Sequence, residues 1–372
     1  MKRLTDAEQL DWLQLIRTDN IGPITFHRLV ARFGSPGEAM KALPQLAAKA
    51  GRKLPLKPSP RDDAEAELDR ATTIGARLLT QADGDYPEYL AAIPDAPPII
   101  YVRGHATLFE RPAIAIIGAR NASGVGRKIA RNLAKGLGQA EIVVASGLAR
   151  GIDGAAHEAA LKSGTIAVVA GGVDVIYPPE HGELTERIAN EGAIISEQPP
   201  GATPTARDFP KRNRLISGLS RGVCVVEAAA RSGTLITARF ALEQGREVFA
   251  VPGSPLDPRC QGANRLIRDG ATLVERADDI IEALSSAYQG AHETGRDLFD
   301  WREENQDAFS EEETGRVRSA VLETLSFTPL HRDELLREID APASLIIDAL
   351  IGLVLAGEAE EHSGGKFSLK AD

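Results

Sequence analysis

The stretch AIAIIGARNASGVGRKIA, residues 113–130, decides the fold. It begins with an uninterrupted apolar run, passes through a turn rich in glycine, and continues with small, apolar and basic residues at helical spacing. This is the strand, turn and helix that open a Rossmann-like unit. Because the run is apolar throughout instead of alternating, we expect a strand buried on both faces, as in a parallel sheet covered by helices.

Short apolar runs of the same kind recur between amphipathic segments over residues 80–285. Such alternation is typical of an α/β domain with a parallel sheet. We therefore predict an extended Rossmann-like domain of six or seven strands, with a parallel or mixed sheet. The expected strands are 113–118, 142–147, 165–171, 193–198, 223–228, 247–253 and 272–275.

Two smaller units are expected on either side of this domain. Residues 5–50 have the spacing of short helices, which predicts a small helical domain of the SAM or helix-hairpin-helix type. Beyond an acidic stretch, three helices and a Gly-Gly hairpin predict a winged-helix domain. The expected organisation is 1–79 for the helical domain with its linker, 80–287 for the Rossmann-like domain, 288–314 for the acidic linker and 315–372 for the winged helix.

The sequence leaves open whether either smaller unit contacts DNA. The IGP turn at 21–23 either presents helix N-terminal amides to a phosphate, as in a helix-hairpin-helix element, or is a packing hairpin. The last helix of the winged-helix domain is rich in Leu and Ile and carries Asp348 without a cation. We therefore favour packing or protein contact over reading of duplex DNA for that helix.

Composition narrows the class of protein. The 372 residues include 53 Asp and Glu against 43 Lys and Arg, for a net charge of −10, and only two cysteines. Two cysteines make neither a disulfide framework nor a zinc site, which indicates a reducing compartment. The first residues lack the apolar core of a signal peptide, and no apolar run reaches the about 18 residues of a membrane span. We expect a cytoplasmic protein without a membrane segment.

One segment departs from the acidic average. TARDFPKRNRLISGLSRG, residues 205–222, holds five cations and a single carboxylate. Cations that contact phosphates, beside an exposed ring on which a base stacks, are typical of single-strand binding. A solvated charged face, with Phe209 as a core anchor, is the alternative. The candidate nucleic-acid contacts in this segment are Arg207, Phe209, Lys211, Arg212, Asn213 and Arg214.

The glycine-rich turn differs from a dinucleotide-binding loop. That loop needs G-x-G-x-x-G, whose second glycine lets the backbone approach a pyrophosphate, and here Arg120 stands at that position. The second strand also ends in Ser146 and Gly147 instead of an acidic ribose ligand. We therefore expect no nicotinamide or flavin cofactor. Arg120 and Ser123, with Asn121 between them, are expected to keep an anion site.

A second candidate site is a phosphate pocket at the ends of the strands, where the loops of an open α/β sheet meet. Ser232, Gly233 and Thr234 are expected to begin a helix, whose free amides suit a phosphate. An ordinary helix cap is the other interpretation. Gly118 and Gly172, which lie near the ends of two predicted strands, complete this candidate pocket.

No catalytic or metal constellation stands out. Gly218–Gly222 fits G-x-S-x-G, but a nucleophile elbow needs a strand before the serine and a helix after it, and the predicted order is reversed. Asp153 and His157 lie four apart on a predicted helix without a third ligand, so we interpret Asp153 as a cap. We expect neither an enzyme nor a metal site.

Several ordered motifs span residues 80–285. They are IIGARNASGVG, SGLARGIDGAAHEAAL, GGVDVIYPPEH, SEQPPG, DFPKRNRLISGLSRGVCVVEAAARSGTLITA and REVFAVPGSP. Together they resemble the DNA-processing protein family called DprA or Smf. The resemblance implies a homodimer that binds and protects single-stranded DNA and loads the RecA recombinase during natural transformation.

By motif, the resemblance places Arg120, Lys211 and Arg212 on phosphates and Phe209 against a base. Some relatives carry further lysines where this chain has YPPEHGEL, residues 177–184, which weighs against that loop as a DNA contact. A nucleotide-processing Rossmann enzyme, similar to nucleoside monophosphate phosphoribohydrolases, is one alternative, although ARSGTLITA lacks the glycine pair and glutamate of their PGGxGTxxE loop. A regulator that binds duplex DNA through its winged helix is the other.

Overall fold

The computed structural model describes residues 4–49, 56–291 and 311–370. These residues fall into two units, one made mainly from Ala66–Glu293 and the other from Leu4–Glu65 together with Thr294–Asp372. Most of the predicted acidic linker lies outside the described residues. Its first positions belong instead to helix α12 (Ala277–Ala291).

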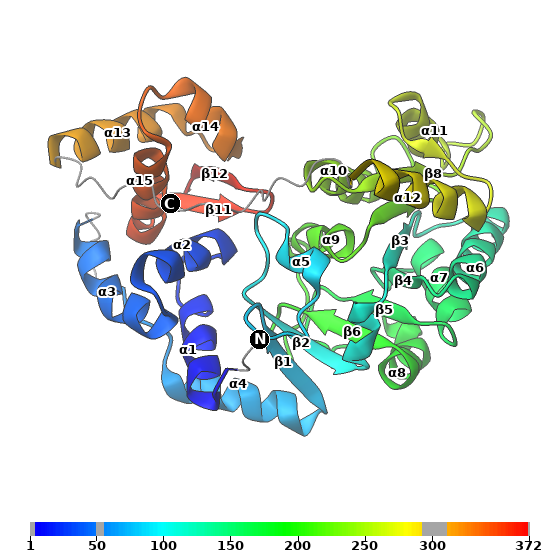
Figure 1. Cartoon of the computed structure of the whole chain (residues 1–372), viewed down its shortest axis with the longest axis horizontal. Helices are drawn as coiled ribbons and strands as arrows, with labels where there is room; N and C mark the ends of the chain where they lie inside the picture. Colours follow the sequence, from blue (N-terminus) through cyan, green and yellow to red (C-terminus); the bar gives the residue numbers. More distant parts are fainter. Residues whose placement is uncertain (1–3, 50–55, 292–310, 371–372) are drawn as a thin grey trace. The chain divides into compact units, whose positions relative to one another are not determined.

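A nine-stranded sheet forms the centre of the first unit, in the order β1-β2-β6-β5-β4-β3-β7-β8-β9 (Figure 1). The predicted Rossmann-like domain is confirmed, with all seven predicted strands parallel to one another. They are β3 (Ala113–Ile117), β4 (Val143–Ser146), β5 (Thr165–Val168), β6 (Ala193–Ser196), β7 (Gly222–Val225), β8 (Glu247–Ala250) and β9 (Thr272–Leu273). Two further strands, β1 (Ala76–Thr80) and β2 (Ile99–Gly104), were not predicted and pair antiparallel at one edge.

Helices cover both faces of this sheet, which explains why its strands are apolar throughout. Successive strand side chains point to opposite faces. Ile114 and Ile116 therefore pack on one side, against α6 (Gly124–Gln139), α7 (Ile152–Ala160) and α12. Ala115 and Ile117 pack on the other, against α9 (Asp208–Gly218), α10 (Thr234–Glu243) and α11 (Gln261–Arg268).

The strand order creates a topological switch point between β3 and β7. From β3 the chain passes through β4 and β5 to β6, then returns to the other side of β3 to form β7 and β8. The loops after β3 and β7 therefore lead to helices on opposite faces, α6 and α10. In open α/β sheets, this divergence is where a ligand crevice is expected.

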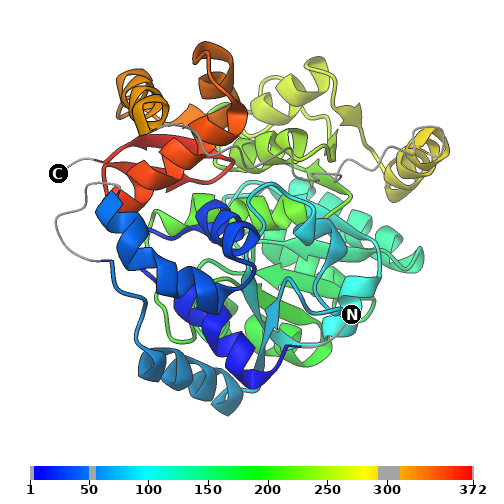
Figure 2. The same cartoon turned by 60° about the vertical axis from the view of Figure 1, so that its left-hand side comes forward.

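The second unit brings the two ends of the chain together, and it confirms the predicted helical and winged-helix domains. Figures 1 and 2 both show the red C-terminal hairpin beside the blue N-terminal helices. The helical domain consists of α1 (Asp6–Ile16), α2 (Pro23–Phe33) and α3 (Pro36–Lys49). The winged helix consists of α13 (Glu311–Thr324), β10 (Leu330–His331), α14 (Arg332–Glu338), α15 (Ala343–Ala356), β11 (Ala359–His362) and β12 (Lys366–Leu369).

Glu361 of the winged helix binds the N-terminus of α2. Its carboxylate accepts hydrogen bonds from the backbone amides of Ile24 (3.0 Å) and Thr25 (3.2 Å) and from the Thr25 hydroxyl (2.8 Å). Gly22 allows this approach, since a Cβ there would lie 2.7 Å from Oε1 of Glu361. The amides that a helix-hairpin-helix element presents to a phosphate thus bind a carboxylate of the same chain.

Helix α15, the third helix of the winged helix, is covered on two sides. Ile346 and Leu350 lie in the core of the winged helix. Leu355 is buried in the core of the helical domain instead, with Ile351 packed beside it. A helix enclosed in this way does not present a free face to a major groove, which supports the packing role favoured from its sequence.

Two further findings concern membrane-spanning helices and the two cysteines. Across residues 4–49, 56–291 and 311–370, the structure contains no helix with the length and apolar character needed to cross a membrane. Cys224 and Cys260 are both buried with free thiols. Burial raises the pKa of the Cys224 thiol to about 12, so this thiol is unreactive at neutral pH.

Replacing Glu361 by alanine is expected to destabilise the second unit. The substitution leaves two amides and a hydroxyl of α2 without their acceptor, and should cost about 1–3 kcal/mol of unfolding free energy. Urea unfolding followed by tryptophan fluorescence suits this test, because Trp12 packs against Phe26 in the core of this unit. The matched control is Glu360→Ala, an exposed neighbour on the same strand. Equal midpoints for the two variants would contradict the assignment.

Candidate nucleic-acid interface

A pocket of ≈ 390 Å³ opens over the carboxyl ends of β4 and β5, beside the switch point. The turn at 147–150, which follows β4, and residues 169–171, which follow β5, line its base. Residues 175–179 contribute one wall. The pocket brings together four predicted contacts from two distant segments of the sequence, Arg120, Asn121, Phe209 and Arg212.

An aromatic pair and a guanidinium stand in this pocket. The ring centroids of Phe209 and Tyr177 are 5.2 Å apart with the planes tilted by 51°. Cζ of the exposed Arg120 lies 5.4 Å from the Phe209 centroid, within cation–π range. Phe209 is only half-buried and Tyr177 keeps 44 % of its surface exposed, so neither ring is an ordinary core anchor. Tyr177 was not among the predicted contacts. The sequence indicated only that its loop, residues 177–184, lacks lysines that some relatives carry.

Arg212 supplies a buried positive charge to the pocket. Its Nη1 donates hydrogen bonds to the carbonyls of Gly147 and Val168, at the ends of β4 and β5. Burial lowers the pKa of Arg212 to about 10, with Asp153 opposing this effect, so the guanidinium stays charged at neutral pH. Gly147 is confined between these two side chains. A Cβ there would lie 2.9 Å from Oδ2 of Asp153 and 3.0 Å from Nη2 of Arg212.

Arg214, two residues further along α9, points into the protein. Its side chain is 3 % exposed and forms ion pairs with Glu197 (2.5 Å) and Asp95 (3.5 Å). Its Nη1 also donates to the Asp95 carbonyl. Its pKa is raised above the ordinary value because these carboxylates outweigh the effect of burial. The structure thus places Arg214 in a buried ion-pair network, which does not favour its predicted role as a DNA contact.

The other predicted residues of this segment lie outside the pocket. Arg207 and Lys211 are exposed at the first turn of α9, whereas Asn213 is half-buried. The carboxylate of Asp208 accepts the amide and hydroxyl of Thr205, both at 2.7 Å, and so fixes the turn before the helix. The two cations therefore face solvent at the start of α9.

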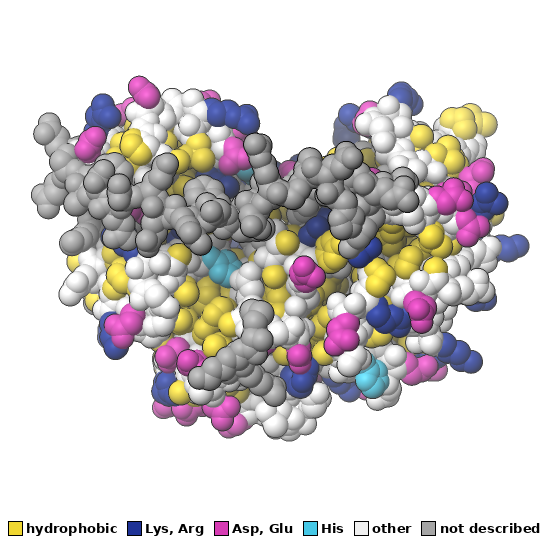
Figure 3. All heavy atoms as spheres, viewed as in Figure 1, with side chains coloured by type: hydrophobic (Ala, Val, Ile, Leu, Met, Phe, Trp, Pro, Cys, Tyr) yellow, Lys and Arg dark blue, Asp and Glu magenta, His cyan; other side chains and the backbone are white. Residues whose placement is uncertain are grey.

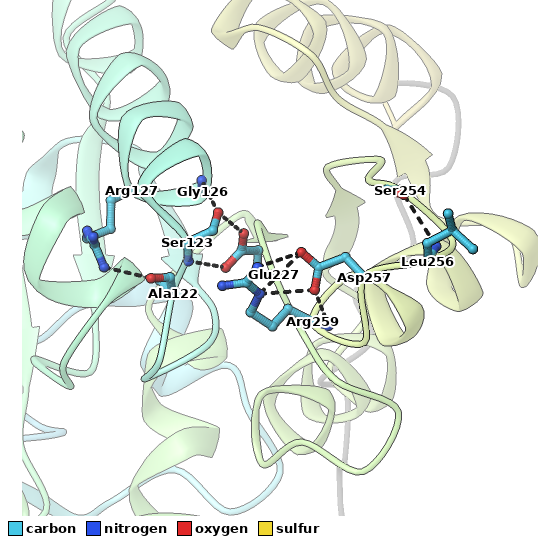
Figure 4. A network of polar contacts seen from close by, with 9 residues as sticks. All are labelled: Ala122, Ser123, Gly126, Arg127, Glu227, Ser254, Leu256, Asp257 and Arg259. Atoms are coloured by element: carbon cyan, nitrogen blue, oxygen red, sulfur yellow. Dashed lines mark hydrogen bonds and ion pairs between the residues drawn. The ribbon is translucent and has the colours of Figure 1, made fainter.

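The predicted anion site at Ser123 is filled by a carboxylate of the chain itself. Glu227, two residues after β7, accepts the Ser123 amide at 3.0 Å and the Ser123 hydroxyl at 2.5 Å, while this hydroxyl accepts the Gly126 amide (Figure 4). A Cβ at Gly126 would lie 2.5 Å from the Glu227 side chain. The N-terminus of α6, where a dinucleotide pyrophosphate binds in related folds, is thus closed. Ser123 thus links the two loops of the switch point, which does not favour its predicted role as a DNA contact.

The candidate phosphate pocket does not form as one site. Ser232 and Thr234 hydrogen-bond each other, and the Thr234 hydroxyl donates to the Gly118 carbonyl at 3.2 Å. These contacts tie the 232–234 turn to the β3 loop, and the N-cap of α10 is Gly233, without a side-chain cap hydrogen bond. Gly172 lies elsewhere, where a Cβ would meet Oδ1 of Asp174 at 2.6 Å. Gly233 is exposed at the start of α10.

Buried polar groups near the pocket have structural roles. Asp153 accepts the amides of Gly147 and Ala149 and so fixes the turn after β4, whereas the N-cap of α7 is Gly151. His157 contacts Thr165 through Nδ1 at 2.7 Å, and burial lowers its pKa to about 3, which keeps the ring neutral. Ser220, two residues after α9, is buried, and its hydroxyl donates to the Ile216 carbonyl of that helix. Among the described residues, no three His, Cys, Asp or Glu side chains gather as a metal site.

Three family models match successive parts of the chain. The model described as DNA recombination-mediator protein A matches residues 77–285. The DprA-like N-terminal HHH domain matches residues 6–70, and the DprA winged helix domain matches residues 305–365.

Individual proteins with these family names are also similar to the chain. The chain is 46 % identical over 201 residues to the DNA processing protein DprA of Streptococcus pneumoniae, covering 54 % of this chain and 71 % of that protein. It is 42 % identical over 228 residues to Protein Smf of Escherichia coli, covering 60 % and 61 %. The S. pneumoniae DprA crystal structure aligns with a TM-score of 0.63 at 35 % identity, over 76 % of this chain and 98 % of that one. DprA from Helicobacter pylori, whose structure concerns its single-stranded DNA binding mode, aligns at 0.52 and 30 % identity, over 57 % and 96 %.

Removing Arg214 is expected to destabilise the protein. Arg214→Ala leaves Asp95 and Glu197 without their buried partner, and should cost about 3–5 kcal/mol of unfolding free energy. Lys211→Ala, an exposed position on the same helix, should change stability by less than about 0.5 kcal/mol. Thermal unfolding of both variants checks this. An Arg214→Ala protein with the wild-type melting temperature but weaker DNA binding would restore Arg214 as a DNA contact.

Proposed function

Because the chain belongs to the DNA recombination-mediator protein A family, called DprA or Smf, we propose that it binds single-stranded DNA in the pocket over β4 and β5. The observation that carries this proposal is the group formed by Arg120, Phe209 and Tyr177. It combines ring surface for a base with a cation for the backbone, which is the combination that single-strand sites use.

The pocket favours an unpaired base over a base pair. Within a duplex, both faces of a base are covered by its neighbours, so an aromatic ring reaches a base face only after unstacking. A single strand leaves these faces accessible, and any base can stack on the half-exposed ring of Phe209. The contact therefore distinguishes single-stranded from duplex DNA, but it does not distinguish one base sequence from another.

The two pocket arginines act in different ways. Arg120 is exposed at the rim, so it binds a phosphate as a screened, solvent-accessible charge. Arg212 is held by two carbonyls at the base, so its charge is fixed in place before DNA arrives. Arg207 and Lys211, just outside, extend the positive charge along the first turn of α9.

The wider role follows from the family. The protein protects incoming single strands as a cytoplasmic homodimer and loads the RecA recombinase onto them, in natural transformation. Its role is binding and not catalysis, and Asp153 and His157 on α7 are both buried in structural hydrogen bonds.

Two other functions receive less support. A nucleotide-processing enzyme of the phosphoribohydrolase type would need the glycine pair and glutamate of a PGGxGTxxE loop, which ARSGTLITA at the start of α10 lacks. A duplex-reading winged helix would need a free face on α15, which packs between two cores. We therefore propose neither of these two functions.

Single-strand binding through the pocket is tested with fluorescent oligo-dT and a duplex over a salt series. We expect tighter binding of oligo-dT. Arg120→Ala should weaken it and make the log-log salt slope shallower by about 0.7, the loss of one phosphate contact. Phe209→Ala should cost about 1–3 kcal/mol of binding free energy, with little change in slope, because it removes stacking.

The control for Phe209→Ala is Phe327→Ala, which removes an exposed ring far from the pocket in sequence and in the other unit. It should leave the affinity unchanged. Equal affinity for duplex and oligo-dT would refute the proposal. So would wild-type binding by folded Arg120→Ala and Phe209→Ala proteins.

A further inference from the structure

Helix α6 carries an uninterrupted positive face. It contains Arg127, Lys128, Arg131 and Lys135 and no Asp or Glu. At about 100° per residue, these four positions fall within an arc of about 100°, and they span about 12 Å along the helix axis. The opposite face is buried against the sheet through small and apolar residues that include Ala130, Leu133 and Leu137. Arg127, Lys128 and Lys135 are exposed, and Arg131 is half-buried.

This face contrasts with the rest of an acidic protein. On other helices of the same unit, exposed arginines pair with a carboxylate one turn away, as in Arg187–Glu191, Arg239–Glu243 and Arg265–Asp269. In the parts of the chain that the structure describes, none of the four α6 cations forms such a pair. Figure 3 shows Lys and Arg side chains intermixed with Asp and Glu over most of the visible face. Unpaired like charges on one helix face repel each other, so an anion bound there would be favoured.

The face is continuous with the pocket along the chain. Arg120 and Asn121 line the pocket, and α6 begins three residues after Asn121. Nη1 of Arg127 donates to the Ala122 carbonyl at 2.6 Å, so the first cation of the face is fixed against the turn that leads out of the pocket.

We propose that α6 is a second phosphate track, along which a single strand continues after it leaves the pocket. This rests on the proposed function, since it assigns the strand a path that begins at Arg120. The track contacts only the backbone. The four cations have no exposed ring among them on α6, so they add affinity for a longer strand without adding base stacking or sequence preference.

The track predicts an effect that depends on oligonucleotide length. The test variant is Lys128→Ala/Arg131→Ala/Lys135→Ala, which keeps Arg127 and its bond to the turn. Binding is measured with oligo-dT of about 6 and about 20 nucleotides, spanning the usual range of single-strand site sizes. For the long strand we expect at least about tenfold weaker binding and a salt slope shallower by about 2, for three lost phosphate contacts. The short strand should bind as it does to the wild type.

The control Arg187→Ala/Arg239→Ala/Arg265→Ala removes the same charge from exposed, paired positions on other helices. It should affect neither strand by more than about twofold, since those arginines are already neutralised. Equal losses in the two triple variants, or a loss that is the same for both strand lengths, would overturn the track and leave the pocket intact. Failure of Arg120→Ala to weaken the short strand would instead refute the pocket. Alanine is the best helix former, so all variants are expected to fold, which circular dichroism checks.

Discussion

The hydrogen bonds between the Glu227 carboxylate and the amide and hydroxyl of Ser123 are the constraint on which the rest of the site depends. They join the two loops that diverge at the switch point between β3 and β7, and they occupy the N-terminus of α6. A Rossmann-like sheet normally opens its ligand crevice at this place. The Glu227 carboxylate closes that crevice. The pocket lies instead over the ends of the neighbouring strands, β4 and β5.

The pocket is held open by a second internal arrangement. Arg212 reaches from α9 to the carbonyls at the ends of β4 and β5, and Asp153 beneath it binds the amides of the turn after β4. Gly147 lies where the two meet, and no larger residue fits without moving one of them. The groups at the base are therefore fixed by contacts within the protein, while those at the rim remain available to DNA. Such preorganisation lowers the entropic cost of binding a flexible strand.

Local patterns were sufficient for the architecture but not for the orientation of single side chains. The parallel strands could be predicted because burial on both faces leaves an apolar run in the sequence. The strands β1 and β2 could not, because β2 joins the sheet by pairing with β6, far along the chain, and β1 pairs with β2. Likewise, the charge of the 205–222 segment pointed to α9, which lines the pocket, whereas the inward direction of Arg214 depends on Asp95 and Glu197. Glu227 was missed for the same reason, although a lone carboxylate at the end of an apolar strand was a usable signal.

The central claim is that single-stranded DNA binds over β4 and β5 and not at the β3–β7 switch point. Photocrosslinking with an oligonucleotide that carries 5-iodouracil tests it most directly, with the modified peptides identified by mass spectrometry. The account predicts crosslinks at Phe209 or Tyr177, the rings that face the pocket. Crosslinks confined to the segments around Ser123 and Ser232, at the switch point, would contradict it.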